Sequence, residues 1–267
     1  VFKPTKEIEV CFKEAGHILG SAIIEIEINP STRSARSGNK NKKIVFSGDL
    51  GNPPVPLLRP PAQIEEADYL IIESTYGDRK HESAKHCQEI VEDVVEEIVA
   101  KNGTLLIPSF ALERTQQLLY HFNNFVEQYK IPQLPIFIDS PLALWITTVY
   151  RKYPQYYNQE ASFLIKSGDD IFKFPGLHFT LTTRQSKKIN DILPPKIIIA
   201  GSGMSQGGRI LHHELRYLAD SKNTLLIVTY QAEGTLGRQI LEGAKKVEIL
   251  EQIIPVRAKV KYITGYS

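Results

Sequence analysis

The first eighty residues alternate between apolar and polar positions in short stretches, a pattern typical of strands with one buried face. The alternation runs through residues 8–12 and again through residues 21–28, where Ile24, Ile26 and Ile28 alternate with glutamates. Two shorter apolar runs, residues 43–46 and 68–73, follow on either side of a Pro-rich crossing at 53–61. Each of these two runs predicts a short buried strand.

From residue 83 onward, segments with helical spacing alternate with short apolar runs. This alternation predicts a parallel sheet with helices on both faces, and such sheets bind ligands at the carboxyl ends of their strands. A last strand at 256–263 is predicted to rejoin the first half of the chain. The predicted helices cover 83–101, 111–129, 141–153, 207–218 and 237–242, and the predicted strands cover 104–108, 135–139, 197–200 and 224–229.

Length and charge set broad limits. The chain has 267 residues, 42% of them apolar, which is enough for one large or two ordinary domains. The net charge of +2 creates no strong global field, so any contact with RNA or DNA must come from a local basic patch. Residues 29–42 form a basic stretch with Arg33, Arg36, Lys40 and Lys42. It is either a solvated loop or a loop that contacts RNA.

The cysteine content and the absence of long apolar runs bear on location. Cys11 and Cys87 cannot build a disulfide framework or a four-thiolate zinc site, which fits a reducing, cytoplasmic compartment. No apolar run reaches transmembrane length, and no signal peptide is visible. The chain begins at Val1 and stops at Ser267 in mid-pattern, so we expect both ends to be truncated.

Two carboxylates follow predicted strands. The strand at 43–46 ends before Ser47 and Gly48, and Asp49 follows them, while the strand at 68–73 ends in Glu73. Carboxylates at strand ends beside small residues are typical of metal and catalytic sites in α/β proteins. The alternative for Asp49 is a turn cap, because Gly-Asp pairs are common in turns.

Six segments in this order resemble motifs of the metallo-β-lactamase superfamily, specifically its β-CASP branch of nucleic-acid-processing hydrolases. The resemblance covers almost the whole chain. It is similar to the RNA-metabolising members of bacteria and archaea and to the pre-mRNA 3′-end cleavage endonuclease. The segments are 15–21 (AGHILGS), 46–51 (FSGDLG), 72–78 (IESTYGD), 108–114 (PSFALER), 201–209 (GSGMSQGGR) and 231–238 (QAEGTLGR).

The resemblance implies an α/β fold class with two domains. Residues 1–78 would form part of a metallo-β-lactamase αββα sandwich. Residues 79–255 would form an inserted, parallel-sheet, Rossmann-like β-CASP domain. Residues 256–267 would start the return into the metallo-β-lactamase domain.

The resemblance also implies two zinc ions as cofactors. His17 matches a zinc-ligating histidine, and Asp49 matches a carboxylate that bridges the two ions. Two metals about 3.5–4 Å apart can hold a hydroxide and stabilise an in-line displacement at phosphorus. Glu73 matches an acidic residue that orients a histidine able to protonate the leaving oxygen. The alternative for Glu73 is a structural turn or capping carboxylate.

Other parts of the family pattern are not present in the sequence. The main zinc-binding run, His-x-His-x-Asp-His, is absent from residues 1–267, and relatives carry it before the segment that contains His17. Relatives continue after Ser267 with Ala-His-Ala-Asp, whose histidine is the partner expected for Glu73. We therefore expect this chain to hold two ligands, no complete site and no activity by itself.

The glycine-rich run at 201–209 opens a predicted helix at a strand end. Backbone N–H groups around Ser202, Gly203, Gly207 and Gly208 would suit a phosphate, with Arg209 nearby. Such glycine-rich turns are equally common as plain packing devices, so both interpretations stay open.

Two further arginines and a histidine pair also have both a functional and a structural interpretation. Arg114 and Arg238 either clamp RNA phosphates or form internal salt bridges. Relatives usually carry glycine where this chain has Glu113, which argues against a phosphate role for Arg114. His212 and His213 point to different faces of a predicted helix, so we interpret them as structural.

These observations together predict zinc-dependent hydrolysis of nucleic-acid phosphodiester bonds, by a ribonuclease of RNA processing or decay. RNA is the expected substrate and single-stranded DNA the alternative; a homodimer is left open, and no membrane partner is expected. The rival interpretation is a non-catalytic relative that serves as a scaffold subunit. A lactamase or thioesterase is disfavoured because those enzymes lack the long inserted domain. We predict that His17 and Asp49 converge in space with Glu73 close by.

Overall fold

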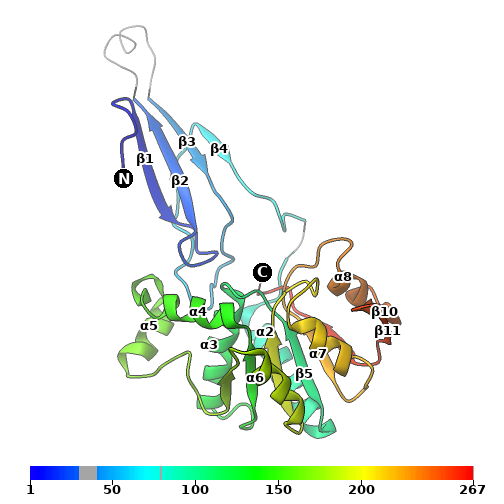
Figure 1. Ribbon diagram of the computed structural model, residues 1–267. Coiled ribbons are helices and arrows are strands. Elements are labelled where there is room, and N and C mark those ends of the chain that lie inside the picture. The colour runs from blue at the N-terminus through cyan, green and yellow to red at the C-terminus, as the bar shows by residue number, and fades with distance from the viewer. Residues whose placement is uncertain (30–40, 79, 267) are drawn as a thin grey trace. The chain divides into compact units, whose positions relative to one another are not determined.

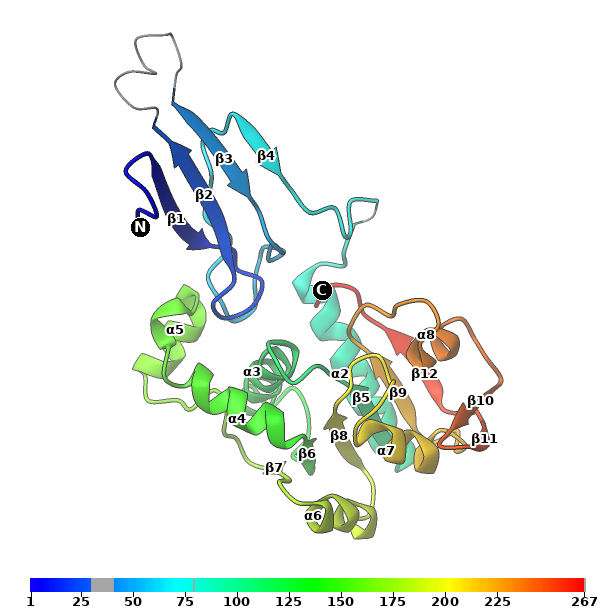
Figure 2. The same cartoon turned by 45° about the horizontal axis from the view of Figure 1, so that its top comes forward.

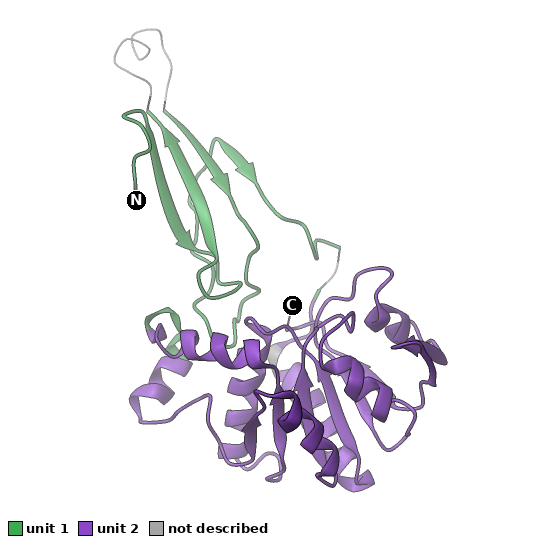
Figure 3. Cartoon of the chain, in the orientation of Figure 1, with its two compact units in different colours: residues 1–80, 155–160 green, residues 81–154, 161–267 purple. Residues whose placement is uncertain are grey.

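A computed structural model describes the chain except residues 30–40, 79 and 267 (Figure 1). The chain divides into two compact units (Figure 3). Unit 1 comprises residues 1–80 and 155–160, and unit 2 comprises residues 81–154 and 161–267. None of the helices in the described residues is both long and apolar enough to cross a membrane.

Unit 1 is built on one four-stranded sheet, and its described residues before position 81 contain no helix. The first three strands pair antiparallel, and the fourth runs parallel to the third. The strands, in spatial order, are β1 (Ile8–Glu14), β2 (Ala22–Ile28), β3 (Lys42–Phe46) and β4 (Tyr69–Ile71).

The buried face of β2 differs from the expected one. Ile23 and Glu25 are buried, whereas Ile24 and Ile26 are only half-buried. Glu25 tolerates this position because Lys13 and Lys43 lie 2.9 and 2.7 Å from its carboxylate oxygens. Burial alone raises the pKa of Glu25, but hydrogen bonds from the two lysines outweigh it and lower the pKa.

Strand β4 corrects the prediction of a buried strand at 68–73. Tyr69, Leu70 and Ile71 are each at least half exposed. The strand lies at the edge of the sheet and pairs only with β3 among the described strands. The apolar run therefore correctly predicted a strand of the sheet, but its side chains are not buried by the described residues.

The segment at 155–160 belongs to unit 1 because it packs on the Pro-rich crossing. Leu58 and Tyr157 form an isolated antiparallel bridge. The Asn158 side-chain amide donates to the carbonyl oxygens of Val55 and Pro56, both at 2.9 Å. A hydrogen-bonded asparagine thus fixes a stretch that has no strand ladder of its own.

Unit 2 contains a six-stranded, wholly parallel sheet, which confirms the predicted α/β fold class. Its spatial order is β12-β9-β5-β8-β6-β7. The strands are β5 (Thr104–Pro108), β6 (Ile136–Asp139), β7 (Leu177–Phe179), β8 (Lys196–Ala200), β9 (Thr224–Ile227) and β12 (Lys259–Tyr262).

Helices connect these strands, and an antiparallel hairpin of β10 (Lys246–Ile249) and β11 (Gln252–Pro255) precedes β12. Figure 2 shows α2 and α7 on opposite faces of the sheet. The helices are α2 (Ala84–Lys101), α3 (Arg114–Glu127), α4 (Pro141–Tyr150), α5 (Gln159–Lys166), α6 (Thr183–Lys188), α7 (Ile210–Tyr217) and α8 (Leu236–Leu241), with 3-10 turns η1 (Pro154–Tyr156) and η2 (Ile189–Asp191).

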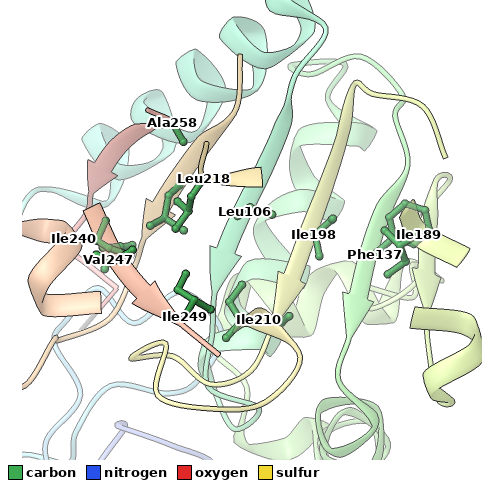
Figure 4. Close-up of a cluster of buried hydrophobic side chains, with 13 residues drawn as sticks. Leu106, Phe137, Ile189, Ile198, Ile210, Leu218, Ile240, Val247, Ile249 and Ala258 are labelled. Carbon is green, nitrogen blue, oxygen red and sulfur yellow. The ribbon is translucent and has the colours of Figure 1, made fainter. Parts of the chain in front are cut away.

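Both faces of this sheet are buried. Leu106, Ile198 and Phe137 lie opposite one another in register and form one cluster with Ile210 of α7 (Figure 4). The alternate strand positions, such as Leu105, are also fully buried. Continuous apolar strands are what a parallel sheet between two helical layers requires.

Strand β12 corrects a domain boundary. The sequence pattern predicts that residues 256–263 rejoin the first half, yet β12 pairs in parallel with β9, and Lys259 lies opposite Thr224. Val260 and Tyr262 pack against the same apolar cluster as β9. The strand therefore completes the sheet of unit 2.

Two helices begin later than predicted for a backbone reason. Helix α3 starts at Arg114 because Glu113 has φ 61°, outside the helical region. Helix α7 starts at Ile210 because Gly208 has φ 75°. A Cβ on Gly208 would lie 2.4 Å from the carbonyl oxygen of Gly201, so only glycine fits this turn.

Candidate functional site

The loop that carries His17 lies against the loop that carries Asp49. The amide of Gly51 donates to the carbonyl oxygen of Ala15 at 2.8 Å. A Cβ on Gly51 would lie 2.0 Å from the Gly16 carbonyl oxygen and 3.1 Å from the His17 nitrogen. The two backbones can meet this closely only because residue 51 is glycine.

The side chains of His17 and Asp49 are available for other contacts. His17 is half-buried and Asp49 is exposed. Within the described residues, neither the imidazole nor the carboxylate has a hydrogen-bond partner. Ser21 Oγ instead accepts from the backbone N–H groups of His17 and Ile18, which shapes the loop without occupying the ring.

Glu73 is tied to the Asp49 loop. Its Oε1 accepts from the Leu50 amide at 2.5 Å, and its own amide donates to Ser47 Oγ at 3.0 Å. Its Oε2 accepts from the Thr75 hydroxyl at 2.8 Å. Glu73 therefore braces the loop that presents Asp49, whatever else it does.

The three predicted residues thus come from segments that touch one another. They do not form a complete metal site: no group of three or more His, Cys, Asp or Glu side chains among the described residues is arranged to hold a metal ion. An imidazole and a carboxylate without protein partners are ligand types that zinc uses. They fit two positions of a zinc site, and ligation itself stays a prediction.

Gly51→Ala tests the contact between the two loops. The added methyl group would collide with the Gly16 carbonyl, so we expect unit 1 to lose at least about 2 kcal/mol of stability. Amide hydrogen exchange should also become faster at residues 15–17. Melting followed by far-UV circular dichroism and hydrogen exchange measures both effects.

Gly77→Ala is the matched control. Its added Cβ would lie 3.3 Å from the nearest atom, the Ser74 carbonyl oxygen, and Gly77 does not have a positive φ. We expect little change. Equal behaviour of the two variants would show that the loop contact at Gly51 is not specific.

The glycine-rich run forms a compact turn between β8 and α7. The Ser202 amide donates to the Gly207 carbonyl at 3.0 Å, and Ile210 donates to Gly201 at 3.0 Å. In the part of the chain that the structure describes, the amides of Gly203, Gly207 and Gly208 have no hydrogen-bond partner. These N–H groups leave the phosphate hypothesis in place as a proposal.

Arg209 is engaged inside unit 2. Its Nη1 lies 2.7 Å from Asp139 Oδ1 and donates to the Thr180 carbonyl at 3.0 Å, while Nη2 donates to the Leu181 carbonyl at 3.0 Å. These contacts favour a structural role for Arg209 and weaken its assignment to a phosphate.

Asp139 is the residue whose importance the sequence did not reveal. Its fully buried carboxylate also accepts from Ser186 Oγ at 2.6 Å and lies 2.8 Å from His213 Nε2. Burial alone raises the pKa of Asp139, but the bonds from His213, Ser186, Thr180 and Arg209 hold it well below its ordinary value. The only sequence signal was an aspartate directly at the end of β6. His213 is structural, as predicted.

The other arginines of the predicted site are partly engaged. Arg238 Nε lies 2.6 Å from Glu242 Oε1, although the side chain stays about a third exposed. Arg114 donates to Gln117 and lies 5.9 Å above the ring of Tyr266. Arg238 therefore keeps access to solvent beside the 231–238 turn.

The predicted basic stretch at 29–42 is described only in part. Arg33, Arg36 and Lys40 lie outside the described residues. Lys42 belongs to β3, and its Nζ lies 2.8 Å from Asp68 Oδ1. Its role in an RNA-contacting loop stays untested.

Comparison with known proteins shows what the chain is similar to. Residues 115–240 match the Beta-Casp domain family. The chain is 34% identical over 260 residues to Ribonuclease TTHA0252 of Thermus thermophilus, with 97% of this chain and 57% of the relative covered. It is 35% identical to an RNase J-like protein of Methanocaldococcus jannaschii, with 96% and 57% covered. It is 30% identical to transcription termination factor FttA of Pyrococcus horikoshii, with 98% and 40% covered. The chain thus spans about half the length of these curated relatives.

Proposed function

Because the chain belongs to the β-CASP branch of the metallo-β-lactamase superfamily, we propose that it acts in zinc-dependent hydrolysis of RNA phosphodiester bonds. The observation that carries this proposal is the contact between the His17 and Asp49 loops through Gly51. It brings to one place two family-matched residues whose side chains have no hydrogen-bond partner among the described residues. Processing or decay of RNA in the cytoplasm is the proposed setting, with single-stranded DNA as the alternative substrate and a homodimer as a further possibility to measure.

His17 and Asp49 would hold the metal in this proposal. When bound, two zinc ions supply a hydroxide nucleophile and neutralise charge at the phosphorus. The chain's own contribution is positional. Ser21 shapes the His17 loop, and Glu73 holds the Leu50 amide next to Asp49.

Glu73 has a second proposed role, as the residue that orients a general-acid histidine. One feature supports it: Thr75, which bonds Oε2, is exposed, so the Glu73 carboxylate lies near the surface of unit 1. A carboxylate that accepts from an imidazole N–H fixes the tautomer and raises the basicity of the ring.

Phosphate binding is proposed for the turn between β8 and α7. Ser202, Gly203, Gly207 and Gly208 line that turn, and the proposal is supported by the amides of the three glycines, which have no hydrogen-bond partner in the described parts of the chain. Arg238 would add positive charge from the neighbouring turn. Arg209 is proposed to hold the turn in place through Asp139.

The full-length natural protein should cleave single-stranded RNA, lose activity on treatment with a chelator and regain it with zinc. The 267-residue chain by itself should bind zinc weakly and cleave nothing, because its described residues offer two candidate ligands and a tetrahedral site needs four. Calorimetric zinc titration and an electrophoretic cleavage assay measure both.

Two outcomes would contradict these expectations. Metal-dependent cleavage by the 267-residue chain, abolished by Asp49→Ala, would mean that the site is differently composed. A full-length protein that binds RNA but neither holds zinc nor cleaves would instead support the scaffold alternative.

A further inference from the structure

Three neighbouring strands of unit 2 end in segments that meet at one place. Phe110 follows β5, Gly203 follows β8 and Tyr230 follows β9, and β5 lies between the other two strands. The Ser109 amide continues the ladder by donating to the Ala200 carbonyl at 2.9 Å. This is the carboxyl edge of a parallel sheet, where such folds bind ligands.

Phe110 is held with its ring against Gly203. A Cβ on Gly203 would lie 2.9–3.1 Å from three atoms of the Phe110 ring, so the ring can rest there only because residue 203 is glycine. The Phe110 carbonyl accepts from Thr115 Oγ1 at 2.7 Å, which fixes the backbone. Nevertheless, 42% of Phe110 is exposed. A large apolar ring on a rigid support is thus open to solvent.

Tyr230 lies in a second segment that is fixed to the same glycine. The Gly203 carbonyl accepts from Thr229 Oγ1 at 2.8 Å and from Gln231 Nε2 at 2.9 Å. Tyr230 lies between these two buried residues and is 43% exposed. The residues on either side are therefore immobilised while the tyrosine itself faces solvent.

Positive charge and amide donors accompany the two rings. Arg238 reaches the segment that carries Tyr230, because its Nη1 donates to the carbonyl oxygen of Gln231, the next residue, at 3.5 Å. The amides of Gly203 and Gly207, without partners among the described residues, belong to the same turn. Exposed rings beside a cation and free N–H groups match the chemistry of bases joined by phosphates.

We propose that Phe110 and Tyr230 form a stacking surface for the bases of single-stranded RNA at this edge of the sheet, with Arg238 beside the RNA backbone. The proposal rests on the proposed function and adds the place and mode of base contact. Stacking on aromatic rings tolerates any base, so this surface would bind RNA without selecting a sequence.

Binding of a short fluorescein-labelled oligoadenylate to the 267-residue chain, followed by anisotropy at low ionic strength with EDTA, tests the proposal. Phe110→Leu and Tyr230→Leu keep apolar bulk but remove the ring. Each should weaken binding roughly 5- to 150-fold, the range that corresponds to the loss of one stacked base. Phe110→Tyr and Tyr230→Phe keep a ring and should bind as the unaltered chain does.

Tyr129→Asn is the matched control. Tyr129 is 92% exposed and follows the far end of α3, which starts at the carboxyl edge and therefore ends at the opposite edge of the sheet. Its φ of 55° suits asparagine. This variant should bind RNA normally. Photo-crosslinking of RNA that carries 4-thiouridine, read by peptide mass spectrometry, should label 108–114 and 229–238.

Unchanged affinity in both leucine variants, or crosslinks only elsewhere, would overturn the proposal. No binding by the unaltered chain would overturn it as well. A change of oligomeric state in the leucine variants, without loss of RNA binding, would show a protein contact instead. Zinc-dependent cleavage by the full-length protein is measured in a separate assay. The stacking surface can therefore be disproved while the proposed function still holds.

Discussion

Asp49→Ala in the full-length natural protein is expected to remove bound zinc and RNA cleavage together, whereas Glu73→Gln should keep the zinc and lower turnover about 10²–10⁴-fold. Asp49 is the candidate ligand, exposed and without a hydrogen-bond partner for its carboxylate in the described residues. Loss of a bridging carboxylate removes charge that offsets two cations. Loss of a general-acid contribution is worth about 10²–10⁴ in rate.

Glu73→Gln removes the charge of the side chain but can keep its hydrogen bonds. The amide oxygen can still accept from the Leu50 N–H, and the amide nitrogen can donate to Thr75 Oγ1. The loop that presents Asp49 should therefore keep its shape. Zinc stoichiometry and single-turnover rates, measured on both variants, separate the two roles.

Glu65→Gln, an exposed carboxylate in unit 1, is the control and should change neither quantity. If Glu73→Gln loses zinc as Asp49→Ala does, Glu73 is a ligand and its match to the family motif has been misread. If Glu73→Gln changes neither zinc nor rate, Glu73 only braces the Leu50 amide.

Glu214→Gln is expected to remove a pH dependence of stability that amounts to roughly 5 kcal/mol between pH 4.5 and pH 8. Glu214 is fully buried in α7, and its Oε1 accepts from Ser205 Oγ at 2.5 Å. Its Oε2 is buried without a partner in the described residues. Burial raises the pKa of Glu214 to about 8 from an ordinary 4.5, and the Ser205 bond only partly opposes this.

The direction in which stability changes with pH follows from the protons bound in the folded and unfolded states. The folded chain keeps the Glu214 proton up to about pH 8, while the unfolded chain releases it near pH 4.5. Stability from this group is therefore complete below pH 4.5 and declines as the pH rises towards 8, by about 1.4 kcal/mol per unit. Glutamine carries no such proton, so the variant should gain relative to the unaltered chain over this window.

The Glu214→Gln variant must be compared with the unaltered chain, because another buried group makes stability change with pH in the opposite direction. Burial, reinforced by Arg114, lowers the pKa of His121 to about 4, so its contribution to stability rises with pH between about 4 and 6.5. The contribution of His121 is the same in the variant and in the unaltered chain, so it cancels in the difference between their free energies of unfolding.

Urea unfolding at several pH values between 5 and 8, followed by Trp145 fluorescence, measures this difference. Trp145 is the single tryptophan of the chain and lies in α4 of unit 2, so it reports on the unit that contains Glu214. Glu248→Gln, at an exposed position of β10, should follow the unaltered chain. A difference between Glu214→Gln and the unaltered chain that does not vary with pH would mean that Glu214 is already ionised in the folded state.

Hydrophobic periodicity alone predicted the class of fold and many of its elements, although it did not predict β7, α5, α6, β10 or β11. The apolar runs at β5, β8 and β9 predicted buried strands, and the helical spacing before and after them predicted a parallel sheet between helices. Periodicity succeeds here because the pattern of a local segment reflects which of its faces is buried. The motif residues His17, Asp49 and Glu73 were likewise visible as unusual types at loop and strand ends.

Only the tertiary structure decided which segments became neighbours. The sequence of β12 allows pairing with either half of the chain, and its apolar contacts with the cluster beside β9 select unit 2. Likewise, nothing near Asp139 in sequence reveals His213, 74 positions away, as its partner. Pairings of this kind depend on loop closure and on shared burial, which a local pattern does not encode.

The same distinction applies to the candidate sites. The sequence supplied an imidazole, a carboxylate and a glycine-rich turn, but glycine's missing Cβ has different consequences at each position. At Gly51 it lets the His17 loop approach, and at Gly203 it makes room for the Phe110 ring. Those consequences come from backbone atoms and rings contributed by distant segments, so the close approach that builds each site exists only in the folded chain.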